Sequence, residues 1–153
     1  MKKVLAILGG VFLVLLLGIA LFVGYAAHEG QALDASSKKY VEESVPPIFS
    51  TWSKDELLKR SSPQMLEVIR KNPQQLDRLF LKLSALGSLK SFSVTGGDSN
   101  VVYMTRDGKV TTASYVGRAI FEKGNAQIAV RLIQLSGNWH ILSFRVSSPL
   151  LLD

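Results

Sequence analysis

The sequence predicts an α+β protein: an N-terminal transmembrane helix, then three to four helices packed on a curved antiparallel sheet of four to five strands. Three observations support this architecture. Residues 4–27 of the 153-residue chain are apolar and carry no charge. Residues 31–87 place apolar side chains at helical spacing between helix-capping residues, and residues 88–148 alternate apolar and polar side chains between turn signals. Because the helices precede the strands, they are expected to cover one face of the sheet.

The first apolar segment is long enough to cross a bilayer. As a helix, Val4 to Ala27 would extend about 36 Å, and the hydrocarbon core of a bilayer is about 30 Å thick. A cleavable signal peptide has a shorter apolar region of about 7 to 15 residues, so residues 1–27 are expected to remain as an anchor. Cleavage after the weak small-x-small site Gly24-Tyr25-Ala26 is the alternative. The absence of cysteine excludes a lipoprotein anchor.

The distribution of charge predicts the orientation of this anchor. Lys2 and Lys3 precede the apolar segment, so the positive-inside rule puts the N-terminus in the cytoplasm and residues 28–153 in the periplasm of a bacterial cell. These residues carry sixteen basic and twelve acidic side chains, without any run of five basic residues. Nucleic-acid binding needs a continuous basic stripe and is therefore not expected. The lack of cysteine also excludes disulfides and thiolate chemistry.

The helical region begins with an amphipathic pattern over residues 31–45. Pro46-Pro47 is expected to end this helix, because proline disrupts a helix interior. Ser53 and Glu56 then have the spacing of a capping box, in which each side chain bonds to the backbone N–H of the other residue. They predict the start of a short second helix.

Two further helices open with a capping residue followed by proline. Ser62-Pro63 begins one, and Asn72-Pro73 begins the strongest helical pattern of the chain. Gly87 is expected to end the last helix. The apolar stripe of this helix consists of Leu76, Leu79, Phe80, Leu83 and Leu86.

After Gly87 the period changes from helical to alternating. Strands over residues 101–105 and 109–121 flank the turn Arg106-Asp107-Gly108, and Asp-Gly between apolar runs is a strong hairpin signal. Gly124-Asn125 and Gly137-Asn138 mark two further turns. Gly96-Gly97-Asp98 lacks the lysine of a phosphate-binding loop, and a polar hairpin loop is expected there.

The strand after Gly137 holds His140 beside Trp139, which raises the question of catalysis. A catalytic imidazole needs an acid to orient it, and the only acid between Gly108 and Pro149 is Glu122, next to a turn. His140 is therefore expected to pack in the domain or to line a pocket. Without a bulge, strand alternation puts His140 on the face toward the helices with Leu142, Phe144 and Val146, and puts Trp139, Ile141, Ser143, Arg145 and Ser147 on the other face.

The order of elements and the ending Trp139-x-Ile141-x-x-Phe144-x-Val146 resemble the cystatin-like, or nuclear-transport-factor-2-like, superfamily, in particular its small secreted or membrane-anchored bacterial domains. The resemblance covers roughly residues 33–148 and includes Trp52 after the early helix and the helix start at Ser62-Pro63. It implies a cystatin-like sheet covered by helices. Members of the superfamily include isomerases, dehydratases and limonene epoxide hydrolases, together with non-catalytic ligand-binding or assembly modules, so the fold does not choose among these functions.

We therefore expect a single-pass inner-membrane protein whose periplasmic domain, residues 28–153, acts by binding. It would be an accessory subunit of a cell-envelope complex or would self-associate, and no catalytic, cofactor-binding or metal-binding residue is predicted. The first alternative is a domain that binds a small apolar ligand in a pocket lined by Phe80, Tyr115, Phe144 and His140. The second is an isomerase- or hydratase-type enzyme, which would need an acid within hydrogen-bond reach of His140 or Tyr115.

Overall fold

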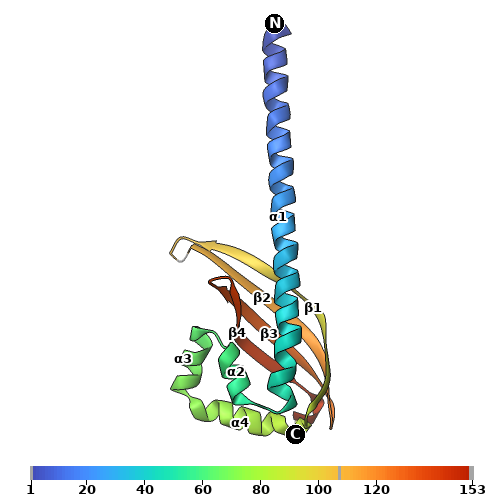
Figure 1. The fold of residues 1–153 in the computed structure, drawn as a ribbon, viewed down its shortest axis with the longest axis vertical. Coiled ribbons are helices and arrows are strands. Elements are labelled where there is room, and N and C mark those ends of the chain that lie inside the picture. Colours follow the sequence, from blue (N-terminus) through green and yellow to red (C-terminus); the bar gives the residue numbers. More distant parts are fainter. Residues whose placement is uncertain (1, 107, 152–153) are drawn as a thin grey trace. The chain divides into compact units, whose positions relative to one another are not determined.

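The structure, a computed structural model, describes residues 2–106 and 108–151. Side chains in the first part of the chain are described only for residue 17, residues 19–21 and residue 30 onward. The described residues form four helices, α1 (Lys2–Ser50), α2 (Lys54–Arg60), α3 (Pro63–Lys71) and α4 (Pro73–Leu83), and four strands, β1 (Leu89–Met104), β2 (Gly108–Phe121), β3 (Asn125–Leu135) and β4 (Asn138–Ser147) (Figure 1). Two 3-10 turns, η1 (Ser84–Leu86) and η2 (Pro149–Leu151), follow α4 and β4.

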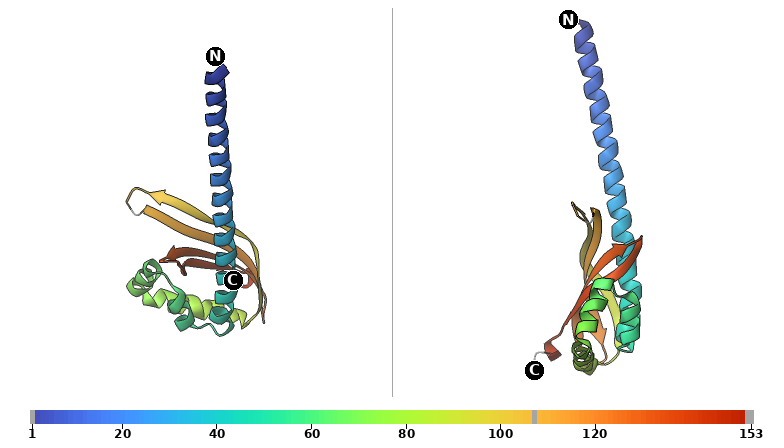
Figure 2. Two further views of the ribbon diagram at one scale, coloured as in Figure 1. Left: turned by 45° about the horizontal axis from the view of Figure 1, so that its top comes forward. Right: turned by 90° about the vertical axis from the view of Figure 1, so that its left-hand side faces the viewer.

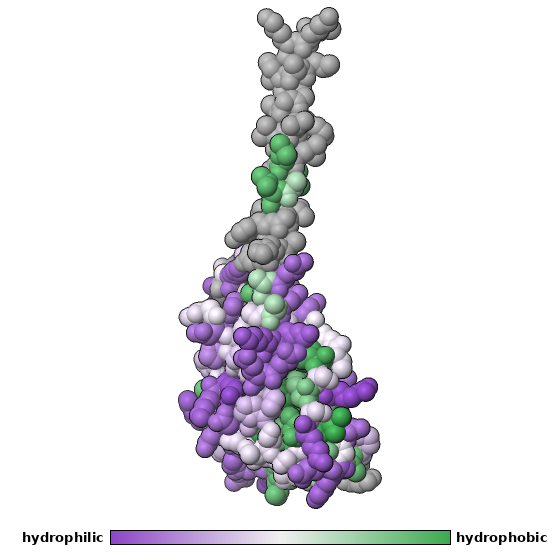
Figure 3. Space-filling model, turned by 45° about the vertical axis from the view of Figure 1, so that its right-hand side comes forward, coloured by the Kyte–Doolittle hydropathy of each residue, from purple (hydrophilic) through white to green (hydrophobic). Residues whose placement is uncertain are grey.

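The chain divides into two compact units, Met1–Leu33 and Asp34–Asp153. In the first unit, the described side chains of Leu17, Ile19 and Leu21 are apolar and exposed, and the described atoms of this stretch are coloured hydrophobic in Figure 3. Among the side chains that the structure describes, no helix is apolar over a sufficient length to cross a membrane. Most side chains of the predicted anchor, residues 4–27, lie outside that description, so the anchor and its cleavage alternative stay predictions.

The second unit is an α+β domain, as predicted. Its strands form one open sheet in the order β1-β2-β3-β4, and each neighbouring pair is antiparallel. The sheet is curved, and the helices lie against one of its faces (Figures 1 and 2). The predicted turns at Gly108, Gly124 and Gly137 connect successive strands. Gly108 and Gly137 have positive φ angles of 69° and 81°, which is why glycine occupies both turns.

The core lies between α1 and the sheet. Alternate residues of β2 and β3 are buried and meet the buried face of α1, as period-two and helical spacing require. Trp52 closes one end of this core: its ring stacks on Phe121 with centroids 5.4 Å apart and contacts Phe80 edge-on. Its Nε1 donates a hydrogen bond of 2.7 Å to the Gly87 carbonyl, which satisfies the polar end of the ring.

Pro46 and Pro47 do not end the first helix, contrary to the prediction. Helix α1 continues through both prolines to Ser50. The following residues Ile48 and Phe49 are each only 1% exposed, so the last turn of α1 buries two large apolar side chains in the core. Burial of such side chains contributes about 1.5–3 kcal/mol each, which is comparable in size to the cost of about 3 kcal/mol or more for each of the two interior prolines.

The predicted helix starts are confirmed in part. The hydroxyl groups of Ser53 and Ser62 each accept a hydrogen bond of 3.2 Å from the third residue of the helix that follows. The reciprocal half of the Ser53 capping box is missing, because the Glu56 carboxylate binds Arg60 instead and the Ser53 N–H donates to a carbonyl of α1. Asn72 precedes α4 but its side chain makes no capping hydrogen bond, so that part of the prediction is wrong.

Strand β1 is longer than predicted. Gly96-Gly97-Asp98 form no hairpin loop but lie inside β1, paired with β2. A register shift between Val94 and Gly96 accommodates one extra residue, Thr95. Gly97 has a φ of 136°, and a Cβ built there would lie 2.2 Å from the Ser114 carbonyl oxygen. Position 97 therefore needs a residue without a side chain, because the backbones of β1 and β2 approach closely there.

Strand β4 contains a bulge that the sequence alternation did not reveal. Leu132 of β3 pairs with Ile141, whereas the preceding Arg131 pairs with Ser143. Leu142 is therefore left over between two paired residues. One extra residue reverses the side-chain alternation from that point onward.

The bulge corrects the predicted orientation of His140. Trp139 is buried, and its Nε1 donates to the Ser36 hydroxyl of α1 at 3.1 Å, so Trp139 faces the helices. His140 follows directly and points to the opposite face, where it is half-buried. Phe144, beyond the bulge, contacts Phe49 of α1 with ring centroids 5.7 Å apart. The predicted helix-facing orientation therefore holds for Phe144 but is wrong for His140.

Candidate functional site

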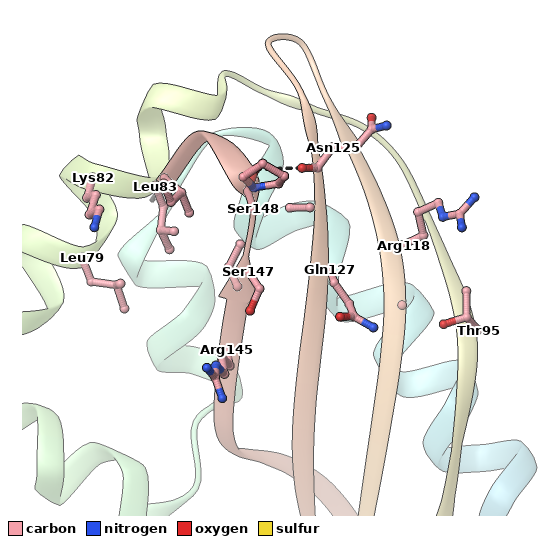
Figure 4. Close-up of a pocket in the computed structure, with 15 residues that line it drawn as sticks. Leu79, Lys82, Leu83, Thr95, Arg118, Asn125, Gln127, Arg145, Ser147 and Ser148 are labelled. Carbon is pink, nitrogen blue, oxygen red and sulfur yellow. Dashed lines mark hydrogen bonds between the residues drawn. The ribbon is translucent and has the colours of Figure 1, made fainter. Parts of the chain in front are cut away.

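A groove of about 930 Å³ lies at the end of the sheet that carries the β2–β3 turn (Figure 4). Helix α4, all four strands and the segment after β4 contribute to it. The lining residues are Leu79, Lys82, Leu83, Thr95, Gly117, Arg118, Asn125, Ala126, Gln127, Arg145, Val146, Ser147, Ser148, Pro149 and Leu151. Its volume falls within the range of about 300–1,000 Å³ that is typical of ligand sites.

Strand register brings the polar side chains of the groove together. Arg118 of β2 pairs with Gln127 of β3, and Gln127 pairs with Ser147 of β4. Arg145 lies two residues before Ser147 and so shares its face. Their neighbours in the strands, including Ala119, are buried toward the helices. These polar side chains therefore point to the sheet face that the helices leave uncovered, and they lie on adjacent strands in Figure 4.

Two walls flank these strands. One is α4, which contributes the exposed side chains of Leu79 and Lys82. The other is the segment after β4, which is held in place by Ser148: its hydroxyl donates a 2.8 Å hydrogen bond to the Asn125 carbonyl. A Cβ at Gly124 would lie 2.4 Å from a methyl carbon of the Leu150 side chain, so the absence of a side chain there lets this segment pack close to the β2–β3 turn.

The charge of the groove is entirely positive. Lys82, Arg118 and Arg145 line it, and the lining residues include no aspartate or glutamate. The ion pairs found among the described residues involve none of these three cations. Because nothing on the groove's own surface neutralises them, the three cations are available to an anionic ligand.

The lining residues offer binding chemistry and lack the parts of a proton-transfer site. Hydroxyl groups come from Thr95, Ser147 and Ser148, but the residues that line the groove include neither an imidazole nor a carboxylate that could activate them. Leu79 of α4 and Val146, which alternates with Arg145 and Ser147 and so faces the helices, add apolar contact area on the helix side of β4, the edge strand. The groove is thus suited to hold an anion that also has an apolar part.

The four residues predicted to line a pocket are only partly brought together. Phe80 and Phe144 are neighbours, with ring centroids 6.4 Å apart, and Phe49 packs against Phe144. Tyr115 is buried against Asp34 and Ser37 of α1. His140 lies on the other face of the sheet. None of the four predicted residues lines the groove.

Tyr115 belongs to a buried polar network that joins α1 to the sheet. Its hydroxyl lies 2.7 Å from the Ser37 hydroxyl and donates to the Asp34 carbonyl at 3.0 Å. The Asp34 carboxylate accepts hydrogen bonds from the backbone N–H of Ser99 in β1, at 2.7 Å, and from the Ser99 hydroxyl. Asp34 therefore offers Tyr115 its backbone carbonyl, while the Asp34 carboxylate binds Ser99 of β1.

Burial raises the pKa of the Tyr115 hydroxyl. The hydrogen bond with Ser37 opposes this shift, and the negative charges of Asp34 and Asp98 add to it. The hydroxyl is therefore protonated at neutral pH and acts as a hydrogen-bond donor to the helix. This arrangement fixes α1 on the sheet and gives Tyr115 no role as a general base.

Sequence reasoning missed the residues that make the groove. Arg118 and Arg145 are far apart in the chain, and only the registers of three strands bring them to one face. Lys82 joins them from a helix. The available signal was that each arginine alternates with small or apolar residues in a strand-like stretch. This pattern indicates that each arginine is exposed, but not that the two arginines lie close together.

In the part of the chain that the structure describes, no three histidine, aspartate or glutamate side chains gather in a way that could hold a metal ion. The chain matches no protein-family model, and no curated protein or solved structure is significantly similar to it.

Proposed function

We propose that this chain is a membrane-anchored binding module of the bacterial envelope, whose groove receives an acidic segment of a partner protein. The observation that carries the proposal is the composition of the groove: three cations, no acid, and an apolar wall. Residues 4–27 would anchor the chain in the inner membrane, with residues 28–153 in the periplasm, because the uncharged segment is long enough to span and two lysines precede it. The helix-covered antiparallel sheet supports membership of the cystatin-like superfamily as part of the same proposal.

The spacing of the cations suits an extended peptide. Arg118 and Arg145 lie on strands two positions apart in the sheet, which separates their backbones by about 10 Å. An extended chain advances about 3.3 Å per residue, so acidic side chains about two to four residues apart could meet both guanidinium groups. Each guanidinium can bind a carboxylate through two parallel hydrogen bonds.

A second candidate ligand is a small anion with an apolar tail. The volume of the groove and the side chains of Leu79, Val146 and Leu151 favour it, since they provide an apolar surface next to the cations. It shares the electrostatic requirement of the first candidate but needs no partner protein.

The test uses the full chain in cells with a photoreactive amino acid at Gln127, the middle of the groove. We expect an adduct with a protein segment that carries two acidic residues within about four positions. Arg118→Glu combined with Arg145→Glu should abolish the adduct, because two attractions become repulsions. Arg131→Glu is the matched control: Arg131 lies on β3, is exposed, and does not line the groove.

Adduct yield that is insensitive to the double reversal, or that falls equally with Arg131→Glu, would contradict the proposal. A photoadduct with a small acidic lipid, lost in the double reversal, would select the second candidate. Absence of any adduct at Gln127 with retained folding would reject both.

A further inference from the structure

The tip of the β1–β2 hairpin exposes apolar side chains on both of its faces. Val102, Tyr103 and Met104 are 39%, 77% and 49% exposed. Alternation puts Val102 and Met104 on one face and Tyr103 on the other. The exposed side chain of Arg106 follows them at the turn. An exposed wedge of this kind is costly in water unless a second surface covers it.

The hairpin tip lies at the end of the second unit where the chain enters from the predicted anchor. At one end of β1, the Gly87 carbonyl just before the strand accepts the hydrogen bond from Trp52, which follows α1. Further along, Ser99 binds Asp34, the first residue of the unit. Strand β1 therefore runs antiparallel to this part of α1. Beyond Ser99 it continues past the first residue of the unit toward the tip, and Figures 1 and 2 show the hairpin extending past the β3–β4 turn.

The connection between the predicted span and the second unit is short. Seven residues separate Ala27, where the predicted span ends, from Asp34, so Asp34 lies at most about 25 Å from the bilayer surface. Five residues of strand from Ser99, which binds Asp34, to Met104 cover about 16 Å. The tip is therefore within reach of that surface.

We infer that the β1–β2 hairpin tip inserts into the surface of the membrane that anchors the chain, an inference that rests on the anchor in the proposed function. The chemistry of the tip matches a lipid interface: Tyr103 has an apolar ring and a polar hydroxyl, as residues at membrane interfaces do, and Val102 and Met104 add apolar area. Arg106 can bind lipid phosphate. The insertion gives the domain a second attachment and fixes its orientation on the membrane.

The absence of cysteine allows a single fluorescent label at any chosen position of the full chain. We would place an environment-sensitive probe on Met104→Cys and reconstitute the chain, one copy per disc, in nanodiscs of phosphatidylethanolamine and phosphatidylglycerol with doxyl-labelled lipid. Leu81→Cys is the matched control, since Leu81 is 76% exposed on α4, at the other end of the unit. Leu17→Cys reports on the anchor itself.

We expect a blue-shifted emission at Met104 and lipid quenching at least about twofold stronger than at Leu81, because an interfacial segment sits about 5–10 Å into the headgroup region. Adding Tyr103→Ser should reduce the quenching at Met104 toward the Leu81 value.

The two proposals fail separately in this experiment. Quenching at Leu17 without quenching at Met104 overturns the inference and leaves the anchor intact, and a blue shift at Met104 without lipid quenching would mean that protein covers the tip. Quenching at Met104 without quenching at Leu17 rejects the anchor and overturns the inference of a second attachment, since the tip would then be the lipid contact without an anchor beside it. No quenching at either position rejects both.

Discussion

Removing the Tyr115 hydroxyl tests whether the polar network holds α1 on the sheet. Tyr115→Phe deletes the 3.0 Å hydrogen bond to the Asp34 carbonyl and the 2.7 Å hydrogen bond with Ser37. In the variant the Ser37 hydroxyl is free to donate to the Asp34 carbonyl, 3.2 Å away, so neither partner is left wholly unsatisfied. With a net contribution of about 1 kcal/mol per hydrogen bond, the substitution should lower the free energy of unfolding by about 1–2 kcal/mol at neutral pH.

The same substitution should change the pH dependence of stability. The pKa of Tyr115 is raised in the folded chain by burial, whereas an unfolded tyrosine titrates near its usual value of about 10. Above about pH 10 the folded state therefore binds more protons than the unfolded state. The contribution is complete below that pH and is lost as pH rises toward the folded pKa, by up to about 1.4 kcal/mol per pH unit. Tyr115→Phe should remove this slope, while Tyr40, whose pKa burial also raises, contributes equally to both proteins.

The measurement is urea unfolding of the full chain in detergent micelles between neutral pH and pH 11, about one unit above the tyrosine reference pKa. Trp52 and Trp139 provide the fluorescence signal, and both lie in the second unit. Tyr103→Phe is the control, because Tyr103 is highly exposed and its hydroxyl should contribute little. A loss in Tyr115→Phe no larger than in Tyr103→Phe, or an unchanged slope at high pH, would refute the structural role of the network.

Two further pairs of substitutions in the same unfolding assay compare matched positions. Ser62→Ala should lower the free energy of unfolding by about 1 kcal/mol because it removes a capping hydrogen bond, whereas Asn72→Ala should cost less than about 0.5 kcal/mol because its side chain makes none; equal losses would contradict the assigned caps. Gly97→Ala should cost about 1–3 kcal/mol or more, since its φ of 136° is strained for alanine and the added Cβ would meet the Ser114 carbonyl. Gly96→Ala has open space for its Cβ and should be nearly neutral, and similar stability of the two variants would show that the bulged register is wrong.

The parts of the fold that short sequence signals determine were predictable. A serine hydroxyl can reach only the backbone a few residues away, so Ser53 and Ser62 mark helix starts wherever the chain folds. Gly87, with a φ of 80°, ends the helical region for an equally local reason. After Gly87 the spacing of apolar residues changes from helical to alternating, and this predicted the sheet, because the β-strand is the regular structure whose side chains repeat every two residues.

Features that depend on distant parts of the chain were not predictable. The helix continues through Pro46 and Pro47 because Ile48 and Phe49 find a core to fill. The bulge at Leu142 arises from the register with β3, and it alone decides which face His140 occupies.

The candidate groove was unpredictable for a related reason. Arg118 and Arg145 become neighbours through β3, and the pairing of Gln127 with both of their strands is a property of the assembled sheet. Lys82 joins the groove only because α4 packs beside the strands, and no local sequence pattern specifies that packing. A charge pattern in sequence predicts a binding site only when the charges share one element.

The groove and the hairpin tip lie at opposite ends of β2, and this constrains the partner. Arg118 is ten residues of strand from Gly108 at the tip, a distance of at most about 33 Å along the strand. With the tip in the membrane surface, the groove would lie up to about 33 Å from that surface, on the periplasmic side. An acidic segment that directly follows a neighbouring transmembrane helix would need up to about ten extended residues to reach it. Photoadducts at Gln127 should therefore map to a periplasmic protein or to an extramembrane domain, and adducts within a few residues of a membrane span would contradict this orientation.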